Sequence, residues 1–207
     1  MKMSIGLASV LVAVAVPALA QTQSPQDMQK AMEAMQKALG AIQQQGGAAA
    51  KPVVDFREMK ALLPKELPGG FKGQIRGQKS GAMGMTIAEA EGNYSKDGGD
   101  GSIRIKLSDM SGMGAIGTMA HAAWATATID NETDDGYEKT TTVSGCKAME
   151  KYNTKSKQGE LQVFVDNRFI VEVRGTDVKM DDMKKALELL DLKKLAALKP
   201  AAAAPQQ

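Results

Sequence analysis

Apolar residues occupy every second position in two stretches of the chain, residues 103–107 and 161–165. A period of two is typical of a β-strand that buries one face and exposes the other. The residues on the predicted buried faces are Ile103, Ile105 and Leu107 in the first stretch and Leu161, Val163 and Val165 in the second. Both stretches are therefore predicted to be half-buried antiparallel strands.

Short turns divide the flanking sequence into further strands. Ser-Gly pairs at residues 80–81 and 144–145, and an Asp-Asn pair at 166–167, are typical of tight connections between strands. With these turns, further strands are predicted at residues 71–79, 83–95, 137–143, 146–153 and 168–174. Apolar residues at helical spacing predict helices at residues 56–63, 112–127, 180–190 and 192–198.

These elements define an α+β fold with an antiparallel six- to seven-stranded sheet and helices on one face. Each half of the domain runs strand, strand, strand, helix, with one extra strand at residues 168–174 in the second half, and the two Ser-Gly turns occupy equivalent places in the halves. That order indicates a βββα duplication, although an antiparallel meander with helices gives the same order without one. The acidic segment at residues 130–136 is predicted to be a solvated loop.

The first twenty residues have the pattern of a secretory signal peptide. Lys2 precedes an apolar run at residues 5–16, and small residues follow it up to Ala20. Cleavage is predicted after Ala20, which makes the mature protein periplasmic or secreted. The alternative is an uncleaved anchor, but the run is short for a bilayer. We expect no transmembrane anchor after cleavage, since no second apolar run of that length follows.

Residues 21–52 are predicted to form an amphipathic helix followed by a linker. The apolar residues of this helix recur at spacings of three and four and form an interaction seam: Met28, Met32, Met35, Leu39 and Ile42. Because such a helix is marginal alone, the seam is expected to dock on the folded domain, to self-associate or to bind a partner. The α+β domain is predicted at residues 53–198, and the Ala/Pro tail at 199–207 is expected to be disordered.

Charge and cysteine content narrow the classes of function. The chain has 26 Lys and Arg against 24 Asp and Glu, and only 4% aromatic residues, so nucleic acid is not expected as a partner. Cys146 is the only cysteine, so no internal disulfide can form and the packed core must hold the fold. Cys146 is expected to point into the sheet, and an intermolecular disulfide is the alternative.

Methionine and histidine supply the candidate metal chemistry. The chain has 14 methionines, and soft thioether ligands suit Cu(I). The candidate ligands lie where the strand at residues 103–108 passes into the following helix: Met110, Met113, Met119 and His121. The alternative is that these methionines fill gaps in a core that is poor in aromatic residues.

Catalytic motifs are not evident in the sequence. His121 is the only histidine, which excludes a two-histidine zinc site. A hydrolase needs only one histidine, but the sequence has no G-x-S-x-G elbow, and nothing in the pattern activates the nearby Ser111. We therefore expect no catalytic residue, no cofactor and no enzymatic activity.

Three motifs resemble those of a group of exported bacterial proteins that have no assigned activity. They are V-V-D-F-R-E-M-K-A-L-L-P-K-E-L-P-G-G-F, S-G-A-M-G-M and D-D-G-Y-E-K. The resemblance extends over residues 53–198 and implies export, but it names no function and no site residues. The sequence thus predicts a non-catalytic periplasmic protein that acts through protein or small-ligand binding. A Met-rich copper-binding protein and a hydrolase using His121 are the alternatives.

Overall fold

The computed structural model describes residues 50–82, 84–96 and 98–201. They belong to the unit Gly46–Gln207, one of two compact units into which the chain divides. The predicted signal peptide at residues 1–20, the interaction seam from Met28 to Ile42 and residues 202–207 of the predicted tail lie outside the described residues. None of the helices in the described ranges is long and apolar enough to cross a membrane.

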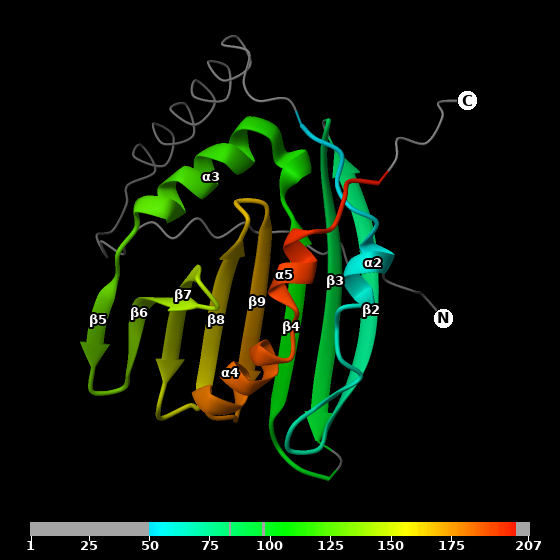
Figure 1. Cartoon of the computed structure of the whole chain (residues 1–207). Helices are drawn as coiled ribbons and strands as arrows, with labels where there is room; N and C mark the ends of the chain where they lie inside the picture. The colour runs from blue at the N-terminus through cyan, green and yellow to red at the C-terminus, as the bar shows by residue number, and fades with distance from the viewer. Residues whose placement is uncertain (1–49, 83, 97, 202–207) are drawn as a thin grey trace, which may run out of the picture. The chain divides into compact units, whose positions relative to one another are not determined.

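A nine-stranded antiparallel sheet organises the domain (Figure 1), which confirms the predicted α+β class. Its strands are β1 (Glu66–Leu67), β2 (Phe71–Ala82), β3 (Met85–Lys96), β4 (Ser102–Asp109), β5 (Asp130–Thr133), β6 (Gly136–Val143), β7 (Cys146–Asn153), β8 (Gln158–Val165) and β9 (Phe169–Thr176). Their order across the sheet is β1-β2-β3-β4-β9-β8-β7-β6-β5. Neighbouring strands are therefore consecutive in the chain except at the centre, where β4 pairs with β9.

The predicted number of strands was wrong, because the two edge strands were missed. β1 has only two residues, which is too short for a period of two to be seen. β5 occupies the segment predicted as an acidic loop, and all four of its residues are exposed. A strand that is exposed on both sides shows no alternation of apolar and polar residues, so a period of two cannot reveal it. Short, charged edge strands also resist pairing with other chains.

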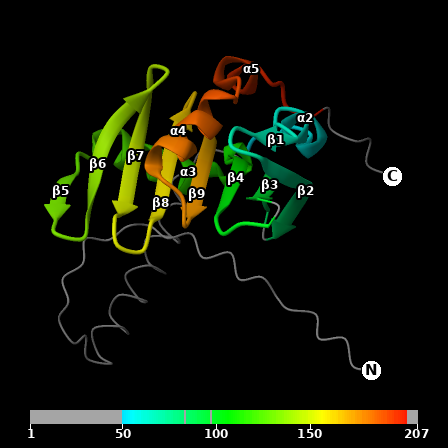
Figure 2. The same ribbon diagram turned by 90° about the horizontal axis from the view of Figure 1, so that it is seen from below.

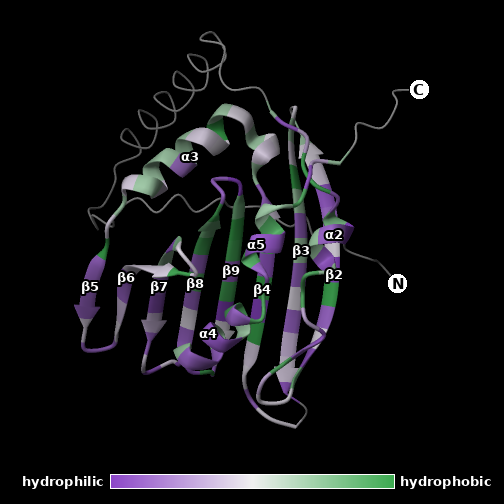
Figure 3. Cartoon of the chain, in the orientation of Figure 1, coloured by the Kyte–Doolittle hydropathy of each residue, from purple (hydrophilic) through white to green (hydrophobic). Residues whose placement is uncertain are grey.

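Three helices cover one face of the sheet and enclose the core (Figure 2). They are α2 (Phe56–Lys60), α4 (Met180–Glu188) and α5 (Leu192–Ala196). The predicted buried faces of β4 and β8 are confirmed, since all six of their aliphatic residues are buried beneath these helices. Hydrophobic and hydrophilic bands alternate along the central strands (Figure 3). From α4, Met183 and Leu187 complete the core at 0% and 2% exposure.

The fourth helix, α3 (Gly114–Thr126), lies on the opposite face of the sheet, so the prediction of helices on one face was wrong. The rings of His121 and Trp124 contact Phe164 of β8, with ring centroids 5.7 Å and 4.2 Å apart. Phe164 alternates with Val163 and Val165, which are buried on the core face. α3 carries no charged residue and its apolar residues form no single stripe, so its pattern could not indicate which face it would cover.

The predicted duplication is not supported by the structure. The helix that follows β4 and the helix that follows β9 lie on opposite faces of the sheet, whereas two copies of one βββα unit would place their helices alike. The second half also contributes four long strands to the sheet, where the first contributes three.

Tyr94 lies flat on the core face of β3 because its neighbours lack side chains. A Cβ atom on Gly92 would lie 2.5 Å from the Tyr94 hydroxyl, and one on Gly73 would lie 2.4 Å from the ring. The hydroxyl donates a hydrogen bond of 2.7 Å to the carbonyl oxygen of Pro64, which follows α2. The side chain is 1% exposed. The two glycines thus form a seat for the ring, and the ring joins the sheet to the segment after α2.

Because Tyr94 is buried, we expect the protein to lose stability at alkaline pH. Loss of solvent raises the pKa of its phenol from 10.0 to about 12. Because the pKa of Tyr94 in the folded state lies above that in the unfolded state, its contribution to the free energy of unfolding is complete below pH 10. This contribution falls as the pH rises toward 12. We expect one tyrosine to ionise near pH 12 by phenolate absorbance, and we expect that transition to vanish in Tyr94→Phe. A variant that kept the transition would refute the assignment.

Asp109 joins four parts of the chain in a buried polar cluster, called here the Asp109 junction. The fully buried carboxylate accepts hydrogen bonds from the Val54 backbone N–H at 2.8 Å and from the Ser111 hydroxyl at 2.6 Å. It also forms an ion pair of 2.8 Å with Arg168 in the β8–β9 hairpin. Arg168 in turn donates to the carbonyl oxygen of Leu198 at 2.9 Å. The junction therefore ties both ends of the described domain to the sheet.

Candidate functional site

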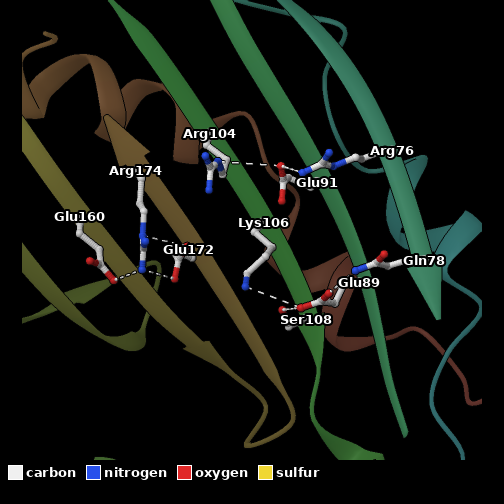
Figure 4. A network of polar contacts seen from close by, with 10 residues as sticks. All are labelled: Arg76, Gln78, Glu89, Glu91, Arg104, Lys106, Ser108, Glu160, Glu172 and Arg174. Carbon is white, nitrogen blue, oxygen red and sulfur yellow. Dashed lines mark hydrogen bonds and ion pairs between the residues drawn. The ribbon is translucent and has the colours of Figure 1, made fainter. Parts of the chain in front are cut away.

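The sheet face opposite α2, α4 and α5, called here the open face, carries charged and polar side chains of β2, β3, β4, β8 and β9 (Figure 4). The strand register places charges of alternating sign side by side across it, in a row of Arg76, Glu91, Lys106 and Glu172. Antiparallel sheets commonly have one face packed against the core and the other face exposed to solvent, so a polar face is ordinary. The open face therefore needs a specific feature beyond polarity before it can be called a site.

Figure 4 shows ion pairs in two places on the open face, one on β2, β3 and β4 and the other on β8 and β9. On β2, β3 and β4, Glu91 pairs with Arg76 at 2.7 Å and lies 3.9 Å from Arg104. On β8 and β9, Arg174 pairs with Glu172 at 3.1 Å and with Glu160 at 3.4 Å. The basic side chains of these pairs are at least half exposed, so each pair is worth only about 0–1 kcal/mol of stability.

The second group borders a hollow of about 500 Å³ that spans β5 to β9, called here the polar trough. Strand register places its side chains on the open face, and they include Asn131, Glu138, Lys151, Gln158, Glu160 and Arg174. Two ion pairs cross the strands within it, one of them between Lys151 and Glu138 at 3.4 Å. Two acids and two bases leave the trough electrically balanced, with donors and acceptors of both signs facing solvent.

The four candidate metal ligands are only partly brought together. Met110 and His121 line the same cavity of about 610 Å³, beside α3 and the β8–β9 hairpin. Met113 precedes α3 and is half-buried, and it does not line this cavity. Met119 is 57% exposed. Because Met119 and His121 are two residues apart on a helix, they point to different sides of α3.

His121 has an unusual environment for a polar side chain. Its Nε2 atom is buried and has no hydrogen-bond partner among the described residues. Burial holds the pKa of the imidazole below its ordinary value of 6.5, so the neutral ring predominates at pH 7. Ser111 lines the same cavity, but its hydroxyl donates to Asp109. The described contacts therefore give His121 neither a serine nor a carboxylate to work with.

Two buried acids were missed by the sequence analysis, although a pattern could have revealed them. Asp109 continues the period of two set by the buried residues of β4, and Glu150 follows Ala148 on the core face of β7. Glu150 is 1% exposed, pairs with Lys184 of α4 at 2.9 Å and accepts a hydrogen bond from the Tyr137 hydroxyl. Burial, followed by this bond, raises the pKa of Tyr137.

The contacts of these buried acids indicate a structural role. Burial alone would raise the pKa of Asp109, but hydrogen bonds from Arg168, Ser111 and Val54 outweigh it and hold the pKa below its usual value of 3.8. A carboxylate held ionised by several donors is a poor general base, because its lone pairs are already engaged. Cys146 forms no disulfide within the chain, and its half-buried side chain packs against the core.

No family model, no curated protein and no solved structure matches this chain. Within the described ranges, no group of three or more His, Cys, Asp and Glu side chains is arranged to hold a metal ion. The candidate side chains of the described residues lie at two cavities, the polar trough and the cavity beside α3.

Proposed function

We propose that the protein is an exported, non-catalytic binding protein whose ligand surface is the polar trough on β5 to β9. The observation that carries the proposal is the placement of two solvent-facing ion pairs, Glu138–Lys151 and Glu160–Arg174, in a hollow of about 500 Å³. A volume of this order suits a small molecule or a short peptide segment.

The charges of the trough favour a ligand that carries both signs. A ligand carboxylate can take the place of Glu138 or Glu160 beside the bases, while a ligand ammonium group can take the place of Lys151 or Arg174 beside the acids. Exposed pairs contribute about 0–1 kcal/mol each, so exchanging them for ligand groups costs the fold little. Arg174 offers a planar guanidinium that binds a carboxylate through two parallel hydrogen bonds. Amino acids and short peptides are the ligand class that fits.

The side chains around the trough support a non-catalytic role. The described residues that line it include no serine, histidine or cysteine, which are the usual nucleophiles and bases. Each of its two acids is paired with a base. The sequence pattern of residues 1–20 supports export, and an exported protein with a single free thiol must rely on packing rather than disulfides.

The proposal predicts selective loss of binding when the bases of the trough are removed. Free amino acids and dipeptides are screened for a rise in melting temperature, and hits are measured by calorimetry. Lys151→Ala and Arg174→Ala are each expected to weaken binding about tenfold or more, which corresponds to about 1.4 kcal/mol. Both residues have exposed side chains, so these variants should keep their fold.

Arg76→Ala is the matched control for this experiment. Arg76 lies on the same face and pairs with a glutamate, but it lies on β2, outside the trough. Its removal is expected to leave the affinity unchanged. The proposal fails if no probe of this class binds, or if Arg76→Ala weakens binding as much as Arg174→Ala does.

A further inference from the structure

The outer edge of β2, at one side of the sheet, is only partly covered by another strand (Figure 1). β1 pairs with only the first two residues of β2, and the Gly73 N–H donates to the carbonyl oxygen of Lys65 at 2.8 Å. Beyond Gly73, the structure gives this edge no backbone partner within the described ranges. The free edge of β2 is therefore residues 74–82, after which the chain turns into β3.

The strand register shows which backbone groups of the free edge point outward. In an antiparallel pair, alternate residues bond to the partner strand, and the others direct their N–H and C=O groups away from it. Since the Gly73 N–H points toward β1, residues at intervals of two from Gly73 also face outward. They are Ile75, Gly77, Lys79 and Gly81. The first two of them are half-buried and the last two are exposed, so solvent reaches this row.

β2 lacks most of the features that protect sheet edges from pairing with other chains. Natural edges are often kept short, or are interrupted by prolines and bulges. β2 has twelve residues, contains no proline and pairs with β3 in one unbroken register. A regular edge of this length is a template to which another strand can add. The bases of the free edge, Arg76 and Lys79, then decide which register is allowed.

Like charges exclude several ways of pairing this edge with a second copy of itself. In an antiparallel pair related by a two-fold axis, the residue at the axis lies opposite its own copy. An axis at Arg76 or at Lys79 would place two bases directly opposite one another, which destabilises a strand pair. An axis at Gly77 would leave Gly81 unpaired, because its opposite residue would be Gly73, whose N–H is already bonded.

An axis at Gln78 avoids these conflicts and uses the whole free edge. Gln78 is the midpoint of the free edge, so every outward-facing residue finds an outward-facing partner. Lys79 then lies opposite Gly77 of the second copy. Arg76 lies opposite Ser80 of the second copy, which is uncharged. The two bases therefore select one register, whereas an uncharged edge would allow several.

We propose that the protein forms a symmetric dimer in which β2 pairs antiparallel with β2 of a second copy, about a two-fold axis at Gln78. The pairing joins two nine-stranded sheets into one continuous sheet. The polar trough lies on β5 to β9, away from this edge, so the dimer leaves it open and does not depend on its ligand. Because an edge-to-edge contact is narrow, we expect a dissociation constant on the order of 10 µM.

The first test is analytical ultracentrifugation of the purified protein at about 1–500 µM, a range that spans the expected dissociation constant. Lys79→Pro removes an outward N–H and is expected to weaken the dimer about tenfold or more. The variant should keep its fold, because this N–H does not bond to β3, and circular dichroism melting curves check this. Lys79→Ala is the matched control. It keeps the N–H and should dimerise at least as strongly as the unmodified protein.

A pair of substitutions at Ser80 tests the register itself. Ser80 is exposed, and the proposed axis places it opposite Arg76 twice in each dimer. Ser80→Glu is therefore expected to strengthen the dimer about threefold or more, and Ser80→Lys to weaken it by a similar factor. Three results would each overturn the proposal: a protein that stays monomeric over the whole range, a Lys79→Pro dimer of unchanged strength, as association through residues 28–42 would give, or equal effects of both Ser80 substitutions.

Discussion

Replacing Asp109 by alanine is expected to lower the free energy of unfolding by about 3–5 kcal/mol. The reason is that the substitution leaves the largely buried Arg168 guanidinium without its carboxylate partner. It also leaves the Val54 N–H without the acceptor of its hydrogen bond. Denaturation in urea, read as the midpoint and slope of the transition, measures the loss. A loss below about 1 kcal/mol would show that the junction does not hold the domain together.

Asp135→Ala provides the matched control for the Asp109 junction. Asp135 also pairs with a base, Lys155, but both side chains are more than half exposed. Its loss is expected to cost less than about 1 kcal/mol. The stabilisation from Asp109 should also depend on pH. Since its folded pKa is lowered, the contribution is complete above the ordinary value of 3.8 and is lost as the pH falls through the folded pKa. The difference between the unmodified protein and Asp109→Ala should shrink accordingly in acid.

Gly92→Ala is expected to destabilise the protein by about 1–3 kcal/mol, although it adds a single methyl group. The added Cβ would lie 2.5 Å from the Tyr94 hydroxyl, so the ring must leave its seat and its hydrogen bond to Pro64. Tyr94→Ala, which empties the seat, is expected to cost about 3–5 kcal/mol. Urea denaturation of both single variants and of the double variant gives the coupling between them.

The double variant makes the seat falsifiable. Once Tyr94 is alanine, the methyl group at Gly92 has room, and adding it should change the free energy of unfolding by less than about 0.5 kcal/mol. Strict additivity of the two substitutions would show instead that Gly92→Ala acts through the strand backbone and not through the ring.

The strands that bury one face could be predicted from the sequence, whereas the strands that bury neither face could not. Ile103 and Val163 lie in strands whose alternation follows directly from a covered and an uncovered face. β5 is exposed on both sides, so its residues carry no period, and the segment resembles a loop. The place of Asp109 in the period of two of β4 indicates that its side chain is buried. The role of a buried carboxylate, however, is clear only once its hydrogen-bond donors are known.

The polar trough could not be derived from the sequence for a topological reason. Its pairs join Lys151 to Glu138 and Arg174 to Glu160, across strand boundaries that depend on the exact register. The placement of β9 between β4 and β8 is a long-range pairing that no local pattern encodes. The cavity beside α3 depends on the side of the sheet that this helix covers, and a helix without a polar face leaves that undetermined.

The pairing of β4 with β9 also sets the order in which the domain can form. The hairpins on either side are local and can form early, but the central seam joins residues that are far apart in the chain, which slows folding. Until β9 emerges, β4 presents an unpaired edge with apolar side chains and is prone to associate with other chains. A newly synthesised chain thus remains prone to association until β9 pairs with β4. A truncation that removes β9 is therefore expected to lower the solubility of the protein strongly, because it leaves the edge of β4 unpaired.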